Sequence, residues 1–96
     1  MENQKGGNTA EIKIADNMPG AEYANAMQIN HTKEEFQMMF FNILGFSGRV
    51  VGKIITNPGH FKRMIAAMSD NLKKYEARFG VVKESEAMDK EIGFKG

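Results

Sequence analysis

The segment EFQMMFFNIL, residues 35–44, decides the fold because it is apolar on both sides of an extended chain. In a β-strand, successive side chains point to opposite faces of the sheet. One face would carry Phe36, Met38, Phe40 and Leu44, and the other would carry Met39, Phe41 and Ile43. A single helix can cover only one face of a sheet, so the pattern predicts a central strand that needs two covers.

Shorter strand patterns flank this segment. Residues 23–30 alternate in a period of two, which is typical of a half-buried strand, and residues 31–34 form a polar connection. Residues 49–56, RVVGKIIT, are rich in β-branched side chains, and residues 45–48 have the composition of a tight hairpin. Gly52 marks a bulge or a close backbone approach. A weak alternation at residues 11–15 predicts a fourth, edge strand before a turn at residues 17–20.

A helix is signalled at both of its ends. Asn57 can cap it, Pro58 occupies the first helical position, and Gly80 follows its end. Seven large side chains between these signals recur at spacings of three and four: Phe61, Met64, Ile65, Met68, Leu72, Tyr75 and Phe79. The prediction is an α+β fold, a three- or four-stranded antiparallel meander followed by one C-terminal amphipathic helix, residues 58–79, packed on the sheet.

The chain of 96 residues has room for one domain. Residues 1–10 are polar and are expected to form a disordered tail, and residues 11–80 form the domain. Residues 81–96 alternate charge with few apolar side chains, which predicts a mostly flexible tail with a short helix at about residues 84–92. No signal peptide or apolar run of roughly 20 residues is evident, and we expect a cytoplasmic protein.

Catalytic machinery is not recognisable in this sequence. There is no Cys, and two histidines, His31 and His60, are too few for a zinc site built on imidazoles. Neither His has a Ser, Cys or paired carboxylate placed for a triad, and Glu34 and Glu35 would point to opposite faces of a strand. No phosphate-binding loop is present. We therefore expect no enzymatic activity, no cofactor, no metal and no catalytic residue.

Positive charge is concentrated in the second half of the domain. The formal net charge is +1, but residues 49–78 hold seven positive residues against Asp70 and Glu76. Six of the positive residues are candidate nucleic-acid contacts: Arg49, Lys53, Lys62, Arg63, Lys73 and Lys74. A solvated helix face is the alternative, favoured because the aromatic residues that could stack on bases lie in the apolar segment instead.

Three segments resemble a family of small bacterial and archaeal proteins known only as a domain of unknown function: YANAMQINHTKEEF, GRVVGKIITNPGHFKRMIAAM and NLKKYEARFG. The similarity covers about residues 23–80. The matching residues are Tyr23, Ala24 and Asn25, His31 and Thr32, Glu35 and Phe36, Asn57 and Pro58, Lys62 and Arg63, and Tyr75, Glu76, Phe79 and Gly80. After Phe36 the chain departs from the pattern, since family members often carry an acidic residue and a longer loop there. The resemblance implies a fold unit and no activity.

The two apolar faces of residues 35–44 also carry the functional expectation. If the helix covers one face, Met39, Phe41 and Ile43 are left uncovered on the other. Large exposed apolar patches usually mark interfaces, so this second face should be covered by another surface. We expect a two-fold homodimer or a protein partner at that face, and nucleic acid is the less favoured partner. An adaptable Met-rich surface for varied clients, and cover by the chain's own termini, are the alternatives.

Overall fold

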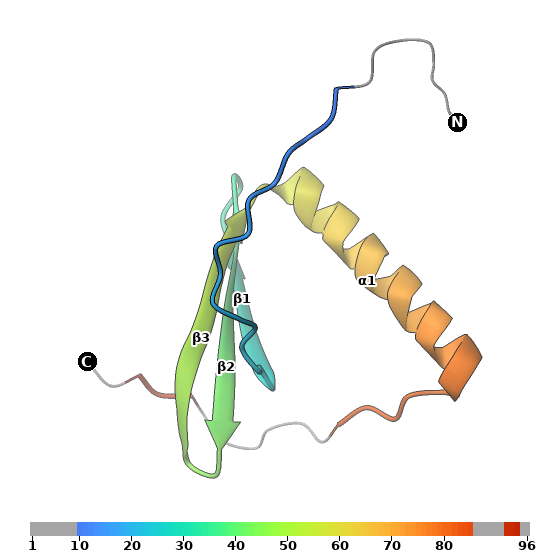
Figure 1. The fold of residues 1–96 in the computed structure, drawn as a ribbon. Coiled ribbons are helices and arrows are strands. Elements are labelled where there is room, and N and C mark those ends of the chain that lie inside the picture. Colours follow the sequence, from blue (N-terminus) through green and yellow to red (C-terminus); the bar gives the residue numbers. More distant parts are fainter. Residues whose placement is uncertain (1–9, 86–91, 95–96) are drawn as a thin grey trace.

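The computed structural model of the protein describes residues 10–85 and 92–94, and in that part the predicted α+β fold is confirmed. Three strands, β1 (Ala26–His31), β2 (Phe36–Leu44) and β3 (Ser47–Thr56), form one antiparallel sheet in the order β1-β2-β3. A single helix, α1 (Pro58–Phe79), follows the last strand (Figure 1). The helix has the predicted bounds.

Strand register assigns each side chain to a face. Residues directly opposite each other in a ladder share a face, so Ile29 and Ile54 lie on either side of Met38, and Gln28 and Lys53 on either side of Met39. We call the first set the helix-side face: Met27, Ile29, His31, Phe36, Met38, Phe40, Ile54 and Thr56. We call the second set the opposite face: Ala26, Gln28, Asn30, Gln37, Met39, Phe41, Ile43, Val50, Lys53 and Ile55.

Local hydrogen bonds fix the two hairpins. Between β1 and β2, the Thr32 hydroxyl accepts from the backbone N–H groups of Glu34 and Glu35 at 3.2 Å each, so a polar side chain closes this turn. Between β2 and β3, Leu44 pairs with Ser47 across a two-residue loop. Gly45 has a φ of 65°, and no residue other than glycine has a positive φ in the described chain, so the loop has the φ signature of a type II′ turn.

A bulge interrupts the ladder between β2 and β3, where the sequence predicted an irregularity near Gly52. Phe40 pairs with Gly52 but Phe41 pairs with Val50, which leaves Val51 as the extra residue on β3. A bulge of this kind increases the local twist of the sheet.

The asparagine side chain before β1 extends the sheet. The Asn25 amide donates to the Ile43 carbonyl at 2.8 Å and accepts from the Ile43 N–H at 2.9 Å, while the Asn25 backbone N–H donates to the Phe41 carbonyl. A side chain thus takes the place of a strand residue opposite Ile43. The predicted strand at residues 23–30 accordingly begins later, at Ala26.

The connection between sheet and helix is one residue long. β3 ends at Thr56, α1 begins at Pro58, and Asn57 between them is extended while its side chain accepts from the His60 N–H at 2.7 Å. The Phe61 ring stacks on Phe36 of the helix-side face, with centroids 4.1 Å apart. Beyond this first turn α1 diverges from the sheet (Figure 1), so packing of the helix on the sheet is confined to its N-terminal end.

Other expectations about the ends of the chain fare differently. The predicted edge strand at residues 11–15 is wrong: these residues are extended but unpaired, and Ile12 and Ile14 are exposed. Two apolar side chains in a polar stretch bury too little surface to offset the cost of ordering a strand. The predicted tail at residues 1–10 falls almost wholly outside the described residues. So does most of the predicted helix at 84–92, whose described residues 84, 85 and 92 are not helical.

Replacing Asn25 tests whether this side chain holds the start of the sheet. We expect Asn25→Ala to lower the free energy of unfolding by about 1–2 kcal/mol, because two backbone groups of Ile43 lose their partners. Gln28→Ala, on an exposed strand position, is the control and should change stability by less than about 0.5 kcal/mol. Chemical denaturation followed by circular dichroism measures both, and equal losses would contradict the role of Asn25.

Candidate interaction surfaces

The helix-side face remains largely uncovered. Within it Met38 is buried, at 3% exposure, but Met27, Ile29 and Ile54 around it are each more than 40% exposed. The diverging helix leaves these side chains open, since only Phe61 reaches the sheet with a ring contact among the described residues. The result is an apolar surface that spans all three strands.

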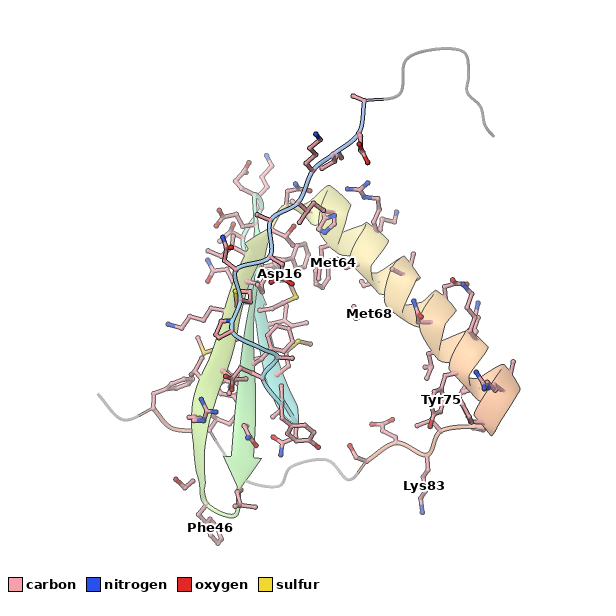
Figure 2. The ribbon with its side chains drawn as sticks, viewed as in Figure 1. Asp16, Phe46, Met64, Met68, Tyr75 and Lys83 are labelled. Atoms are coloured by element: carbon pink, nitrogen blue, oxygen red, sulfur yellow. The ribbon has the colours of Figure 1, made fainter. Side chains whose placement is uncertain are left out.

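The apolar stripe of α1 is also uncovered. No residue of the helix is buried. Met64 is half-buried, and five large apolar side chains further along the helix are about half exposed or more: Ile65, Met68, Leu72, Tyr75 and Phe79. Figure 2 shows Met64, Met68 and Tyr75 on the side of the helix that looks toward the sheet, across the space left by the divergence. Sequence analysis found the stripe but assigned it to the chain's own sheet.

The opposite face holds the interface residues predicted from the sequence, Met39, Phe41 and Ile43. Phe41 is 4% exposed, and its ring lies 5.9 Å from that of Phe94, near the end of the chain. Met39 and Ile43 are half-buried. Cover of this face by the chain's own terminal residues was the alternative to a dimer, and at Phe41 the structure shows that cover. An interface at these three residues stays a prediction.

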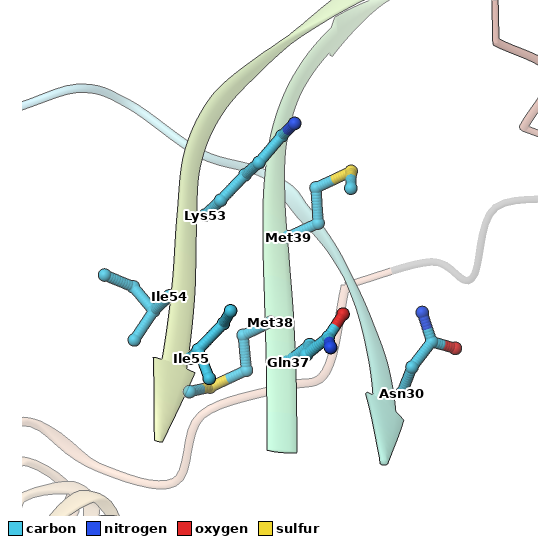
Figure 3. A pocket seen from close by; sticks show the side chains of 7 residues that line it. All are labelled: Asn30, Gln37, Met38, Met39, Lys53, Ile54 and Ile55. Atoms are coloured by element: carbon cyan, nitrogen blue, oxygen red, sulfur yellow. The ribbon is translucent and has the colours of Figure 1, made fainter. Parts of the chain in front are cut away.

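A hollow opens on the sheet between side chains from all three strands (Figure 3). Its lining includes Asn30 and Gln37, whose amides are its uncharged polar groups, the thioether of Met39, and Lys53 as its one charged residue. The other lining residues are apolar, so the hollow carries a single charged group.

Each of the two histidines contacts a nearby side chain. The His31 ring lies 5.6 Å from Phe36, and Nδ1 of His60 lies 3.1 Å from an Arg63 guanidinium nitrogen. The part of the chain that the structure describes contains no group of three or more His, Cys, Asp or Glu side chains that could hold a metal ion. Among those same residues, no helix is both long and apolar enough to cross a bilayer.

The six candidate nucleic-acid contacts do not form one surface. Lys53 lies on the opposite face of the sheet, whereas Lys62, Arg63, Lys73 and Lys74 lie on the helix, which starts from the helix-side face. Two of the six positive charges are paired with carboxylates. Arg49 contacts Glu22 at 2.9 Å, and Lys74 contacts Asp70 at 3.0 Å in the intrahelical spacing expected from the sequence.

Comparison with known proteins places the chain in a family. The family model described as a protein of unknown function, DUF3467, matches residues 1–84. The chain belongs to this family. The resemblance identified from the sequence, to a domain of unknown function, is thereby confirmed. Neither the curated proteins nor the solved structures yielded a match.

Several of the residues on which the resemblance was identified from the sequence have structural roles here. Asn25 completes the sheet beside Ile43, Thr32 closes the first turn, and Asn57 caps the helix. Glu76 accepts from the backbone N–H groups of Val82 through its side chain and of Gly80 through its carbonyl, which secures the helix C-terminus. These four residues therefore stabilise the fold through hydrogen bonds to the backbone.

Removing the Phe94 ring tests the cover over Phe41. We expect Phe94→Ala to lower the free energy of unfolding by about 1 kcal/mol through loss of the aromatic pair, and to raise binding of a hydrophobic dye. Leu44→Ala, at an exposed position of the same strand as Phe41, is the control and should change neither quantity as much. If the two variants behave alike, the end of the chain does not cover Phe41 in solution.

Proposed function

We propose that this protein is a binding and assembly module, with no enzymatic activity of its own, that engages a protein partner through the helix-side face. The observation that supports the proposal is the exposure of Met27, Ile29 and Ile54 around the buried Met38. A contiguous apolar patch on a protein surface commonly marks an interaction site. A cytoplasmic location remains part of the proposal.

The chemistry of the face suits a protein partner. Its aromatic and Met side chains are types enriched in protein interfaces: Phe36, Phe40, Met27 and Met38. Apolar area removed from water contributes about 25 cal/mol per Å², so cover over a few half-exposed side chains adds several kcal/mol before the costs of association. The partner surface should itself be apolar, since the face offers few polar groups apart from His31 and Thr56 at one end.

Nucleic acid is a weaker second candidate. Phe36 and Phe41 of the sheet are engaged with Phe61 and Phe94, whereas base stacking beside a basic groove requires exposed rings among the basic residues. The pairs Arg49–Glu22 and Lys74–Asp70 neutralise two of the six charges that could contact phosphate. Protein binding is thus the function that the geometry favours.

Two neighbouring isoleucines provide a matched test of the helix-side face. Ile54, 49% exposed, lies on the helix-side face, and Ile55, 61% exposed, lies on the opposite face. We expect Ile54→Glu to weaken capture of a protein partner at least tenfold, because the new carboxylate would be desolvated at the interface, and Ile55→Glu to retain it. Quantitative affinity capture from cells that contain the protein measures this difference. Equal capture by both variants, or no partner retained by the wild-type chain, would contradict the proposal.

A salt titration separates the nucleic-acid candidate from the protein-binding proposal. We expect only weak binding to mixed DNA and RNA, with little change when Lys62, Arg63, Lys73 and Lys74 are all replaced by Ala. Binding driven by phosphate contacts would instead be tight at low salt and fall steeply as salt rises. Fluorescence anisotropy at two salt concentrations distinguishes the outcomes, and tight, salt-sensitive binding lost in the fourfold variant would favour nucleic acid.

A further inference from the structure

We infer that two copies of this chain interlock about a two-fold axis, with the sheet of each copy inserted between the sheet and α1 of the other. A second copy is then the partner at the helix-side face, so this inference rests on the proposed function and names its partner. Four layers result, in the order helix, sheet, sheet, helix. The helix-side faces of the two sheets meet at the centre, and each helix covers the sheet of the other copy.

The separation between sheet and helix grows away from Asn57 (Figure 1). At the narrow end Phe61 stacks on Phe36, so no further element fits there. Beyond that contact, the helix-side face and the apolar stripe of α1 look toward each other with exposed side chains on both (Figure 2). An occupant that enters from the wide end therefore needs one apolar surface toward the sheet and a second toward the helix.

The chain's own sheet has two such surfaces at its β2–β3 hairpin end. Leu44, which is 87% exposed, lies on the same face of β2 as Phe40, and Phe41 and Ile43 lie on the opposite face. The polar side chains of the opposite face lie nearer to the Asn57 end: Gln28, Asn30, Gln37 and Lys53. An amphipathic helix offers one apolar stripe and could not contact both surfaces, whereas the hairpin end of a sheet can.

A two-fold axis that is parallel to the plane of the sheet and perpendicular to its strands generates the arrangement. This axis turns the helix-side face of one copy onto that of the other and reverses the strand direction, so each hairpin enters from the wide end. With the axis level with Phe41, Leu44 of one copy lies against Met38 of the other. The C-terminal half of α1 then covers Phe41 and Ile43 of the other copy.

Charged groups do not oppose these contacts. The helix-side face, as defined above, and the apolar stripe contain no Lys, Arg, Asp or Glu. Arg49, which pairs with Asn42 near the hairpin, is neutralised by Glu22 at 2.9 Å. The Phe94 ring that lies on Phe41 is itself 60% exposed, so it extends the apolar surface that the helix of the other copy covers.

The exposed area is ample for such an interface. The chain has 8957 Å² of accessible surface, whereas a folded monomer of its mass is expected to expose about 5,500 Å². Extended residues 10–25 contribute to the excess, but a standard interface removes only about 800 Å² per partner. Interlocking also supplies both covers that the two-faced apolar pattern of β2 requires, a sheet on one face and a helix on the other.

Two pairs of adjacent residues test the two contacts separately. We expect the wild-type chain to be dimeric at micromolar concentration. Ile54→Glu and Leu72→Asp should each raise the dimer dissociation constant at least about a hundredfold, because each places a carboxylate in an apolar contact twice per dimer. The controls Ile55→Glu, on the polar end of the opposite face, and Lys73→Asp, on the outer side of the helix, should leave the dimer intact.

Sedimentation equilibrium measures association, and circular dichroism confirms that each variant stays folded. Interlocking requires both Ile54→Glu and Leu72→Asp to weaken the dimer. If one of them weakens it and the other does not, the contact involves the sheet alone or the helix alone, and the inference is wrong.

Single cysteines report the layer order directly, because the chain has none of its own. The sheet separates Ile43 from α1 of the same copy, since Ile43 lies on the opposite face. A mixture of Leu72→Cys and Ile43→Cys chains should nevertheless crosslink with a short bismaleimide. Leu72→Cys alone should not, because the two helices form the outer layers.

Crosslinking by Leu72→Cys alone, with none in the mixture, would overturn the inference. A wild-type chain that sediments as a monomer would do the same. If that monomer still captures a different protein through Ile54, the proposed function stands and only the identity of the partner is wrong. A chain that neither associates with itself nor captures another protein would reject both.

Discussion

The one-residue connection between β3 and α1 is the constraint on which the rest of this structure depends. Asn57 must accept from the free N–H of His60 with its side chain while its backbone stays extended, and Pro58 fixes the next φ. A connection this short leaves no slack to lay a helix of 22 residues across the sheet. Only the first turn meets the sheet, where Phe61 stacks on Phe36.

The core is small for that reason. Met38 and Phe41 are the buried hydrophobic residues of the described chain, and they lie on opposite faces of β2. The sheet is instead stabilised by specific hydrogen bonds, from Asn25 at its start and from Thr32 in its first turn. Each such bond contributes about 1 kcal/mol, so the isolated chain depends on a few directional contacts more than on burial.

Most of the fold was predictable from the sequence, since period-two patterns, the Gly45 hairpin and the capped helix are local signals. The position of the helix was predicted only in part: it packs on the sheet at Phe61 as expected, but its stripe does not show how far along the helix that contact continues. The strand signal and the helix signal are separated by one residue, Asn57. This short connection is the sequence feature that accompanies the divergence of the helix from the sheet. Cover of the opposite face by the chain's own termini was an alternative in the sequence analysis, but the charged pattern of residues 81–96 did not show that Phe94 would be the residue to reach Phe41.

Small burial in one chain and exposed apolar surfaces have a common thermodynamic consequence. A ligand that binds only the folded state stabilises it in proportion to the logarithm of its concentration, and a protein partner at the helix-side face would act as such a ligand. The apolar area covered by the partner would supply the core that the single sheet lacks, so folding and partner binding would be coupled.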